Sequence, residues 1–462
     1  MGKSVIQSAK QRLSGWGRCP VEECNVFRPE KRRDIDELLS EGGPTEYIAR
    51  GLGRSYGDAA INGGGSVISM VRLNRMLGWD AERGIVECEG GVSLEELINT
   101  FLPRGWFLPV TPGTKFVTVG GAIAHDVHGK NHHGEGSFSR YVLDLELVTP
   151  TGDVLTCSPD RNPDAFWATV GGAGLTGLIL SARIQLIPVE TAYCRVDYHR
   201  CENIETLLTA IRETDQQYKY SVAWVDCLAK GKSLGRSVLM LGEHLPLKEL
   251  PPSIRGPFKV KRKLQPNVPI DFPSLMLNPM SIWAFNTVFY AAHPSAPGKI
   301  IDYDTYFYPL DAIHNWNRIY GKRGFTQYQA TFPLDATAGL VHLLEKLSKS
   351  SRASFLAVLK RMGPASRGLL SYPFEGYTLT LDIPMKASLV PFLHECDEMV
   401  MKHGGRLYLA KDVCTKPEVF AAMYPLLKVF KEVKGKLDPE GRLSSDQARR
   451  LRIVEPRKAD AT

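Results

Sequence analysis

Two glycine-rich segments about sixty residues apart contain the side chains best suited to chemistry. The first is Arg50-Gly-Leu-Gly-Arg-Ser-Tyr-Gly-Asp58, and the second runs from Pro112 to Asn131. Glycine lets a backbone approach a ligand closely or adopt a positive φ. Hydroxyl groups and cations stand beside the backbone N–H groups, and successive N–H groups form a concavity that binds anions. The two segments therefore predict a site for the diphosphate of a large dinucleotide cofactor.

The segments that must position these loops are short and β-rich in the first part of the chain. A helix is predicted from Ser93 to Leu102, with Ser93 as N-cap and Glu96 as its partner three residues later. Tyr141–Thr149 alternates apolar and polar residues, as a half-buried strand does, and a turn leads from it into a second strand. The other predicted elements are strands at 66–70, 84–88, 178–187, 325–332 and 376–383, an extended segment at 406–412 and a helix at 419–432.

Composition sets limits on the class of protein. The 462 residues are 43% hydrophobic and 23% charged, which is typical of a globular protein of two or three domains. No apolar run reaches the roughly 18 residues of a membrane-spanning helix, and the first twenty residues lack the apolar core of a signal peptide. The net charge of +7 favours anionic ligands or an anionic membrane face, and is too small to indicate nucleic acid. We therefore expect a cytoplasmic or peripheral membrane protein.

Other features are weighed against simpler explanations. Gly172-Ala-Gly-Leu-Thr-Gly177 has the spacing of a nicotinamide-binding loop, but a helical segment precedes it and a strand follows, the reverse of the Rossmann order. The nine cysteines are scattered without a C-x-x-C pair, which favours reduced thiols. No acidic or cysteine ligands accompany the histidines at metal-binding spacing, so we predict no metal site. These histidines are His125, His128, His132 and His133.

Two features stay open at this stage. His128, next to Gly129-Lys130, is suited to a reaction cavity, although a structural role is an alternative. The stretch from about 244 to 300 lacks clear periodicity, which indicates a functional lid or partial disorder. It contains Lys259-Val-Lys-Arg-Lys263, which is either a solvated charge run or a docking site for phosphate or a membrane face.

The sequence resembles the vanillyl-alcohol-oxidase-type FAD-binding family in four segments. These are the two glycine-rich loops, the segment Gly171–Ile179 and the late motif Tyr408-x-x-Lys411. Gly-Arg-Ser-Tyr-Gly-Asp58, Phe166-Trp-Ala-Thr-Val-Gly-Gly172 and Gly404-Gly-Arg-Leu-Tyr408 narrow the resemblance to the decaprenylphosphoryl-β-D-ribose 2′-oxidases, the flavoprotein subunits of a 2′-epimerase. The resemblance implies an α+β fold. A two-part FAD-binding domain of PCMH type (1–191) would carry an inserted α+β substrate or cap domain (192–405, with an irregular lid at about 244–300). A C-terminal return segment (406–462) would complete the FAD domain.

The resemblance also assigns roles. It implies Lys411, His128 and Tyr56 as catalytic residues, with Lys411 as the cation beside the flavin. The implied cofactor-binding residues are Gly53, Arg54, Ser55, Tyr56, Gly57, Pro112, Gly113, Thr114, Thr118, Gly121, His125, His128, Ile179, Tyr408 and Lys411. The implied substrate-binding residues are Lys130, Tyr308, Gln327, Gln329 and Lys360. In the segment Ser354–Lys360, mycobacterial members have Asn and Cys where this chain has Ala357 and Leu359, so the resemblance implies that a polar sugar contact is lost there.

The implied activity is oxidation of the 2′-hydroxyl of a polyprenylphosphoryl-β-D-ribose to the 2′-keto sugar. This is the first step toward the arabinose donor for cell-envelope glycans. The implied partners are noncovalent FAD, a lipid-linked sugar phosphate, an NAD(P)H-dependent keto-reductase and a membrane surface. The alternatives are an FAD-dependent alditol or aldonolactone oxidase and a flavin-containing scaffold that is inactive alone. Alditol oxidases commonly bond FAD through a first-loop histidine, at the place of Arg54.

Overall fold

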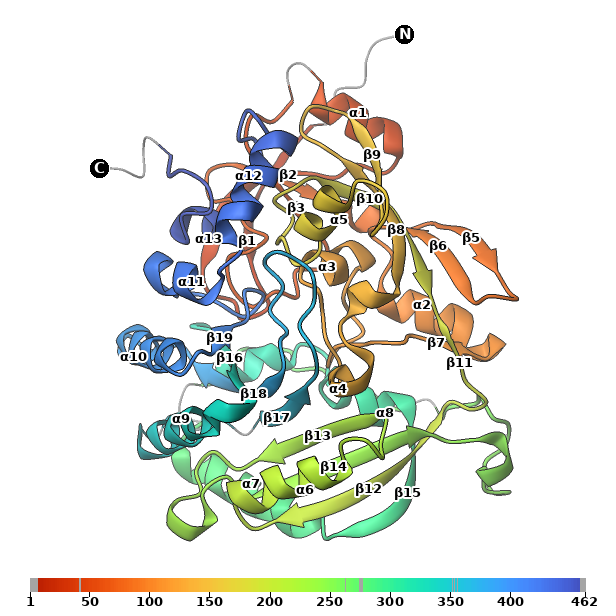
Figure 1. The fold of residues 1–462 in the computed structure, drawn as a ribbon, viewed down its shortest axis with the longest axis vertical. Coiled ribbons are helices and arrows are strands. Elements are labelled where there is room, and N and C mark those ends of the chain that lie inside the picture. The colour runs from red at the N-terminus through yellow and green to blue at the C-terminus, as the bar shows by residue number, and fades with distance from the viewer. Residues whose placement is uncertain are drawn as a thin grey trace.

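The computed structural model describes residues 7–40, 43–261, 263–273, 277–350, 352, 354 and 356–457. The chain forms two regions, with the smaller sheets in the upper part of Figure 1 and one large sheet in the lower part. Both regions combine sheets with packed helices, as the predicted α+β class requires. Among the described residues, no helix is both long and apolar enough to cross a bilayer.

The upper region is built on a mixed four-stranded sheet, ordered β1-β2-β4-β3, and an antiparallel five-stranded sheet, ordered β5-β6-β10-β8-β9. A short pair, β11-β7, leads toward the lower region. The strands are β1 (Ala9–Ser14), β2 (Val21–Phe27), β3 (Tyr47–Arg50), β4 (Ser66–Ser69), β5 (Met76–Asp80), β6 (Ile85–Glu89), β7 (Trp106–Phe107), β8 (Val142–Val148), β9 (Val154–Cys157), β10 (Leu178–Gln185) and β11 (Ile187–Pro188). The helices are α1 (Arg32–Leu39), α2 (Leu94–Phe101), α3 (Val119–Ala124), α4 (His132–Glu135) and α5 (Pro163–Thr169).

Local sequence signals in this region are confirmed. At the start of α2, Ser93 Oγ accepts from the Glu96 N–H at 3.1 Å, and the Glu96 carboxylate accepts from the Ser93 N–H at 2.7 Å. The predicted hairpin after Val148 forms, since β8 and β9 pair in antiparallel register. Both features depend on neighbours within a few residues, so the sequence contains what is needed to predict them.

The lower region is an eight-stranded antiparallel sheet, ordered β15-β12-β14-β13-β17-β18-β16-β19. Helices α6 (Ile204–Thr214), α9 (Thr337–Ser350) and α10 (Leu389–Lys402) share one hydrophobic core with one face of this sheet. The strands are β12 (Tyr193–Cys201), β13 (Tyr220–Val225), β14 (Ser237–His244), β15 (Ala296–Asp302), β16 (Phe325–Pro333), β17 (Ala357–Met362), β18 (Gly376–Pro384) and β19 (Arg406–Leu407). A short helix, α8 (Tyr303–Phe307), follows β15.

The stretch 244–300 is more ordered than predicted. It contains the 14-residue helix α7 (Pro279–Ala292) and most of β15. Asn278 caps α7 by accepting from the N–H groups of Met280 and Ser281, and Pro279 occupies the first turn. The prediction missed α7 because none of its residues is charged, so no polar face marks the helical period. Arg262 of the predicted basic run and residues 274–276 lie outside the described residues.

The predicted helix at 419–432 was also wrong as a single element. The chain forms α11 (Pro417–Met423) and α12 (Leu427–Leu437), separated at Tyr424-Pro425. Proline lacks an N–H group and biases the preceding residue away from the helical region. Tyr424 accordingly has φ −121° and ψ 80°.

After β19 the chain returns to the upper region, where Figure 1 shows α11, α12 and α13 (Asp446–Arg450) beside the first strands. The Tyr47 N–H donates to the Arg442 carbonyl at 2.8 Å. Arg450 Nη2 donates to Asp58 Oδ1 and to Asp412 Oδ2, each at 2.8 Å. One guanidinium therefore connects the first glycine-rich loop to the return segment. The predicted domain boundaries themselves stay a prediction.

Replacing Arg450 with methionine should lower the free energy of unfolding by about 3–5 kcal/mol, because two buried carboxylates lose their cation. Urea unfolding of the purified variant measures the loss. Arg183→Met is the matched control. Arg183 pairs with Asp144 near the surface, where an ion pair contributes about 0–1 kcal/mol. Equal losses in the two variants would contradict the proposed importance of Arg450.

Candidate active site

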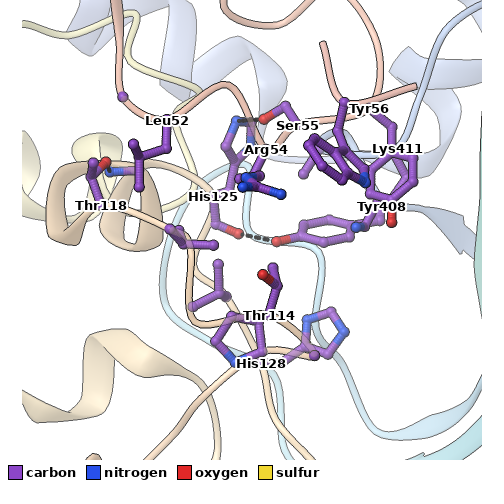
Figure 2. Close-up of a pocket in the computed structure, with 18 of the residues that line it drawn as sticks. Leu52, Arg54, Ser55, Tyr56, Thr114, Thr118, His125, His128, Tyr408 and Lys411 are labelled. Carbon is purple, nitrogen blue, oxygen red and sulfur yellow. Dashed lines mark hydrogen bonds between the residues drawn. The ribbon is translucent and has the colours of Figure 1, made fainter. Parts of the chain in front are cut away.

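One cavity is lined by both glycine-rich loops, by the return segment and by the face of the large sheet opposite α6, α9 and α10. Figure 2 shows side chains from three of these segments around it. All the predicted site residues line the cavity except Gly57 and Tyr308. The structure therefore brings together residues that are up to 358 positions apart, from Gly53 to Lys411.

The first loop is fixed from two sides. Ser55 Oγ lies 3.1 Å from His125 Nε2 in the second loop, and the Tyr56 N–H donates to the Ala410 carbonyl at 2.8 Å. Gly53 has φ +66°, and a Cβ there would meet Arg50 Nη2 at 2.3 Å. Glycine is therefore favoured at this position by its conformation, and any side chain would also have to displace the Arg50 guanidinium.

Gly57 has a different role from the one predicted. It does not line the cavity, and a Cβ on it would lie 2.0 Å from the Asp412 carbonyl oxygen. The missing side chain lets the first loop pack directly against the return segment. Gly57 thus supports the site through close backbone packing and is not part of the wall.

Arg54 presents a cation to the cavity. Its Cζ lies 3.9 Å from the centroid of the Trp16 ring and 5.0 Å from that of Phe116. Its buried Nε has no hydrogen-bond partner within the described part of the chain. A guanidinium that lies over an aromatic ring and has an N–H donor without a partner is suited to a diphosphate.

The second loop is held by its own hydroxyl groups. Thr118 Oγ1 accepts from the Gly121 N–H at 3.2 Å where α3 begins, and Thr114 Oγ1 donates to Asp311 at 2.7 Å. Tyr408 donates to the His125 carbonyl at 2.9 Å, the dashed line in Figure 2. Burial, with a smaller effect from Lys411, lowers the pKa of His125 to about 4, so the ring is neutral at physiological pH.

His128 is a buried, neutral histidine. Burial is the main cause that lowers its pKa well below the ordinary value. Its Nε2 lies 2.9 Å from Gln329 Nε2, and because an amide nitrogen can only donate, the ring nitrogen accepts. The proton is then on Nδ1, which has no partner among the described residues. His128 therefore has one N–H group available to a ligand.

Three lysines bring positive charge to the same cavity. Burial lowers the pKa of Lys130 to about 7, of Lys360 to about 8 and of Lys411 to about 7. Lys130 donates to the Tyr306 carbonyl, and Lys411 Nζ lies 3.8 Å from the Tyr56 ring centroid. Ammonium groups in a desolvated cavity favour an anionic ligand, since an anion offsets the cost of burying them.

Asp382 was missed by the sequence analysis. It is fully buried behind the cavity wall, where its carboxylate accepts from Gln327 Nε2 at 2.7 Å and from the Tyr320 hydroxyl at 3.2 Å. Burial raises its pKa to about 7, and its charge in turn acts to raise the pKa of Lys411. The alternation of residues along β18 could have identified it, since the two-residue period of a strand places Asp382 on the same face as Thr378 and Thr380.

The wall also contains residues without a sequence signal, such as Trp16, Asp311 and Trp316. Tyr308, predicted to face the sugar, is instead buried behind the wall and bonds Thr111 Oγ1 at 2.6 Å. It supports Thr111, which does line the cavity.

The expected loss of a sugar contact at Ala357 and Leu359 was wrong. Both side chains are buried in the core under the helices, on the face of β17 away from the cavity. Their neighbours Val358 and Lys360 line the cavity, as does Thr380 on β18. In the ranges that the structure covers, no group of three or more His, Cys, Asp or Glu residues could hold a metal ion.

Comparison with known proteins agrees with this geometry. Residues 25–158 match the family described as FAD binding domain, and residues 325–451 match the family described as D-arabinono-1,4-lactone oxidase. The chain is 36% identical to an uncharacterized protein of Streptomyces coelicolor, over 78% of this chain and all of that protein. It is 32% identical to cytokinin dehydrogenase 10 of Oryza sativa over 35% of this chain and 32% of that protein.

The similarity to one further relative extends over the whole chain. The decaprenylphosphoryl-β-D-ribose oxidase of Mycolicibacterium smegmatis is 39% identical, over 98% of this chain and 100% of that protein. Together with the FAD-binding domain match, this also confirms the predicted fold class and cofactor. The chain therefore belongs to the decaprenylphosphoryl-β-D-ribose oxidase family and is an FAD-dependent oxidoreductase.

Proposed function

We propose that the protein oxidises the 2′-hydroxyl of a polyprenylphosphoryl-β-D-ribose to the 2′-keto sugar, using noncovalently bound FAD. The full-length similarity to a relative named for that lipid-linked ribose supports the substrate. The observation that carries the proposal is one cavity that joins the two FAD-binding loops to a polar sheet face with Gln327, Gln329 and Lys360.

The residues present fit FAD. The unpartnered Arg54 N–H suits a diphosphate, and Gly113 lines the cavity with open space in the direction of a Cβ. Arg54, Ser55, Gly113 and Thr118 would hold the cofactor. Bound FAD supplies the two-electron oxidant that the sugar C–H bond requires.

The protein must also orient the substrate hydroxyl and accept its proton. The His128 Nδ1–H is placed to bond the hydroxyl oxygen, and Tyr56 stays protonated because burial raises its pKa well above the ordinary value. Lys411 and Asp382 both titrate near pH 7, and as a coupled pair they take up the released proton. Uptake leaves an ammonium group on Lys411, next to Tyr56.

The other two lysines are suited to the substrate's phosphate. Lys130 and Lys360 line the same cavity as Gln327 and Gln329, and their buried ammonium groups gain from a nearby anion. A 2′-keto product needs hydride delivery from the opposite face to become the epimer. An NAD(P)H-dependent keto-reductase is therefore the partner enzyme we propose, with a membrane as the source of the lipid-linked sugar.

A second candidate is oxidation of a free alditol or aldonolactone, which the match of residues 325–451 to D-arabinono-1,4-lactone oxidase favours. That match covers the C-terminal part of the chain only. In addition, Arg54 stands where covalent relatives have a histidine, and a guanidinium is not a nucleophile at working pH. We therefore rank this candidate second.

Anaerobic mixing with candidate substrates tests the proposed function. A short-chain polyprenylphosphoryl-ribose should bleach the flavin band near ~450 nm, because its sugar and phosphate match the cavity's polar face and lysines. Xylitol and a sugar lactone should leave the band unchanged at the same concentration. Bleaching by the lactone alone would replace the proposal with the second candidate.

Acid precipitation tests the bond to the cofactor. We expect the supernatant to be yellow with released flavin, because the first loop has Arg54 where covalent relatives have a histidine, and a guanidinium does not form the bond. Arg54→Ala should still release its flavin on acid treatment, but bind it more weakly than the wild type by equilibrium dialysis. A washed pellet that stays yellow and fluorescent would show a covalent bond.

Asp382→Asn tests the proton-accepting pair. Loss of the negative charge should lower the pKa of Lys411, so Lys411 is neutral and able to accept a proton at lower pH. The acid limb of the rate of flavin reduction should therefore move about 1 unit lower in pH. Stopped-flow absorbance across a range of pH measures this acid limb. In the same assay, Lys411→Ala should reduce its flavin about a hundredfold more slowly than the wild type, because it lacks the proton acceptor.

Tyr320→Phe is the matched control, because it removes a hydrogen bond to Asp382 and keeps the charge. Its acid limb should stay close to that of the wild type. An unchanged limb in Asp382→Asn would show that this carboxylate only holds Gln327 in place.

A further inference from the structure

Helix α7 carries an exposed face without charge. Met280 is 76% exposed, Trp283 57% and Val288 67%. At 100° per residue these three lie on one side of the helix, together with the exposed Ala284 and Ala291. From residue 264 to 298 the sequence contains one histidine, His293, and a single Asp, Glu, Lys or Arg residue, Asp271, which pairs with Arg18. Such a surface is unusual for a protein face in water.

The opposite side of α7 is firmly anchored. Asn286 is fully buried and donates to Asp226 Oδ1 at 2.7 Å, while Asp226 also pairs with Arg236 at 2.8 Å. Phe289 packs against Trp224 with ring centroids 4.6 Å apart. These contacts fix the rotation of the helix, so Met280, Trp283 and Val288 are held outward.

Basic residues stand at the C-terminal end of α7. Arg200 donates to the Ala291 carbonyl at 3.0 Å and lies 4.7 Å from the Tyr290 ring centroid. Lys299 lies 5.3 Å from the ring of Tyr198, which itself contacts His293. Exposed apolar side chains bordered by cations are the combination that binds the interface of an anionic bilayer.

The helix also starts beside the active site. Leu277, the residue before the N-cap, packs against the aromatic cluster of Tyr56, Trp316, Tyr320 and Phe325. Tyr56 and Trp316 line the cavity. Figure 1 shows α7 at the end of the molecule opposite both termini. A lipid chain that leaves the cavity past this cluster would therefore meet the apolar face of α7.

We propose that α7 is a membrane-docking helix, which inserts Met280, Trp283 and Val288 into the interface of an anionic bilayer beside the mouth of the active site. The inference deepens the proposed function and rests on it for the lipid-linked nature of the substrate. Docking would let the sugar head enter the cavity while the polyprenyl chain stays in apolar surroundings. It explains why an apolar helix is exposed at this place.

Co-sedimentation of the FAD-loaded protein with vesicles tests the proposal. Vesicles of equal parts phosphatidylcholine and phosphatidylglycerol should bind the wild type more strongly than pure phosphatidylcholine does. A variant with Met280→Gln, Trp283→Gln and Val288→Gln should lose about a factor of ten or more in affinity for these vesicles, because each change removes apolar area from the interface. The control is Leu426→Gln with Val429→Gln, which alters exposed apolar residues on and just before α12 and should bind as the wild type does.

A second measurement separates this proposal from the function it rests on. The α7 variant should reduce its flavin with a short-chain, water-soluble substrate at the wild-type rate, since the changed residues are outside the cavity wall. It should be slow only with a long-chain substrate in vesicles. If no ribose substrate reduces the wild type while vesicle binding still depends on α7, the proposed function fails and docking stands. Equal sedimentation of wild type and variant, or a wild-type dimer in solution that the variant loses, would overturn the docking proposal.

Discussion

The guanidinium of Arg450 is the contact on which the active site depends. Asp58 ends the first glycine-rich loop and Asp412 follows Lys411, so two buried carboxylates meet where the loop and the return segment touch. Burial raises the pKa of Asp58. For Asp412, burial acts in the same direction, but the charge of Arg450 and the hydrogen bonds from Thr415 and Arg450 outweigh it, so the pKa lies below its ordinary value. Without a cation the two carboxylates would repel, and with it they form a clamp. The clamp sets the approach of Tyr56 to Lys411.

The rest of the site follows from the alternation of side chains in the large sheet. On β16, Tyr328 and Ala330 join the core under the helices, while Gln327 and Gln329 face the cavity. This places polar groups opposite the glycine-rich loops with no extra element. Because the same surroundings exclude water, the cavity's lysines and the Asp382 carboxylate behind it have pKa values near neutrality. Lys360 and Asp382 come from the sheet, whereas Lys130 and Lys411 come from the second loop and the return segment, so the shifted pKa values depend on packing these segments against one face of the sheet.

The parts predicted from sequence are those determined by near neighbours. The capping box at Ser93, the hairpin after Val148 and the glycine-rich loops all depend on residues a few positions apart. The features that the sequence did not predict depend on contacts between distant segments, or on a stretch in which polar and apolar residues do not alternate. Trp16 and Asp311 reach the cavity from remote segments. Ala357 and Leu359 were assigned to the wrong face, because a resemblance in sequence does not give the strand register that decides which alternate positions point to the core. The uncharged sequence of α7 showed no helical period, although it folds as a helix.

Buried polar contacts fix the orientation of α7, just as the Arg450 clamp fixes the first loop against the return segment. The bond from Asn286 to Asp226 cannot form if the helix rotates, and breaking it would leave Asp226 Oδ1 with the Leu228 N–H and Oδ2 with Arg236, while the buried Asn286 amide would lose its acceptor. The rotation that satisfies Asn286 also turns Met280 and Trp283 outward, against the hydrophobic effect. The opposite side of the helix buries Ile282 and packs Phe289 against Trp224, so these contacts and the Asn286 hydrogen bond together outweigh the exposure of Met280 and Trp283. The cost of that exposure disappears when the face meets an apolar interface, which makes the anchored helix more stable on a bilayer than in water.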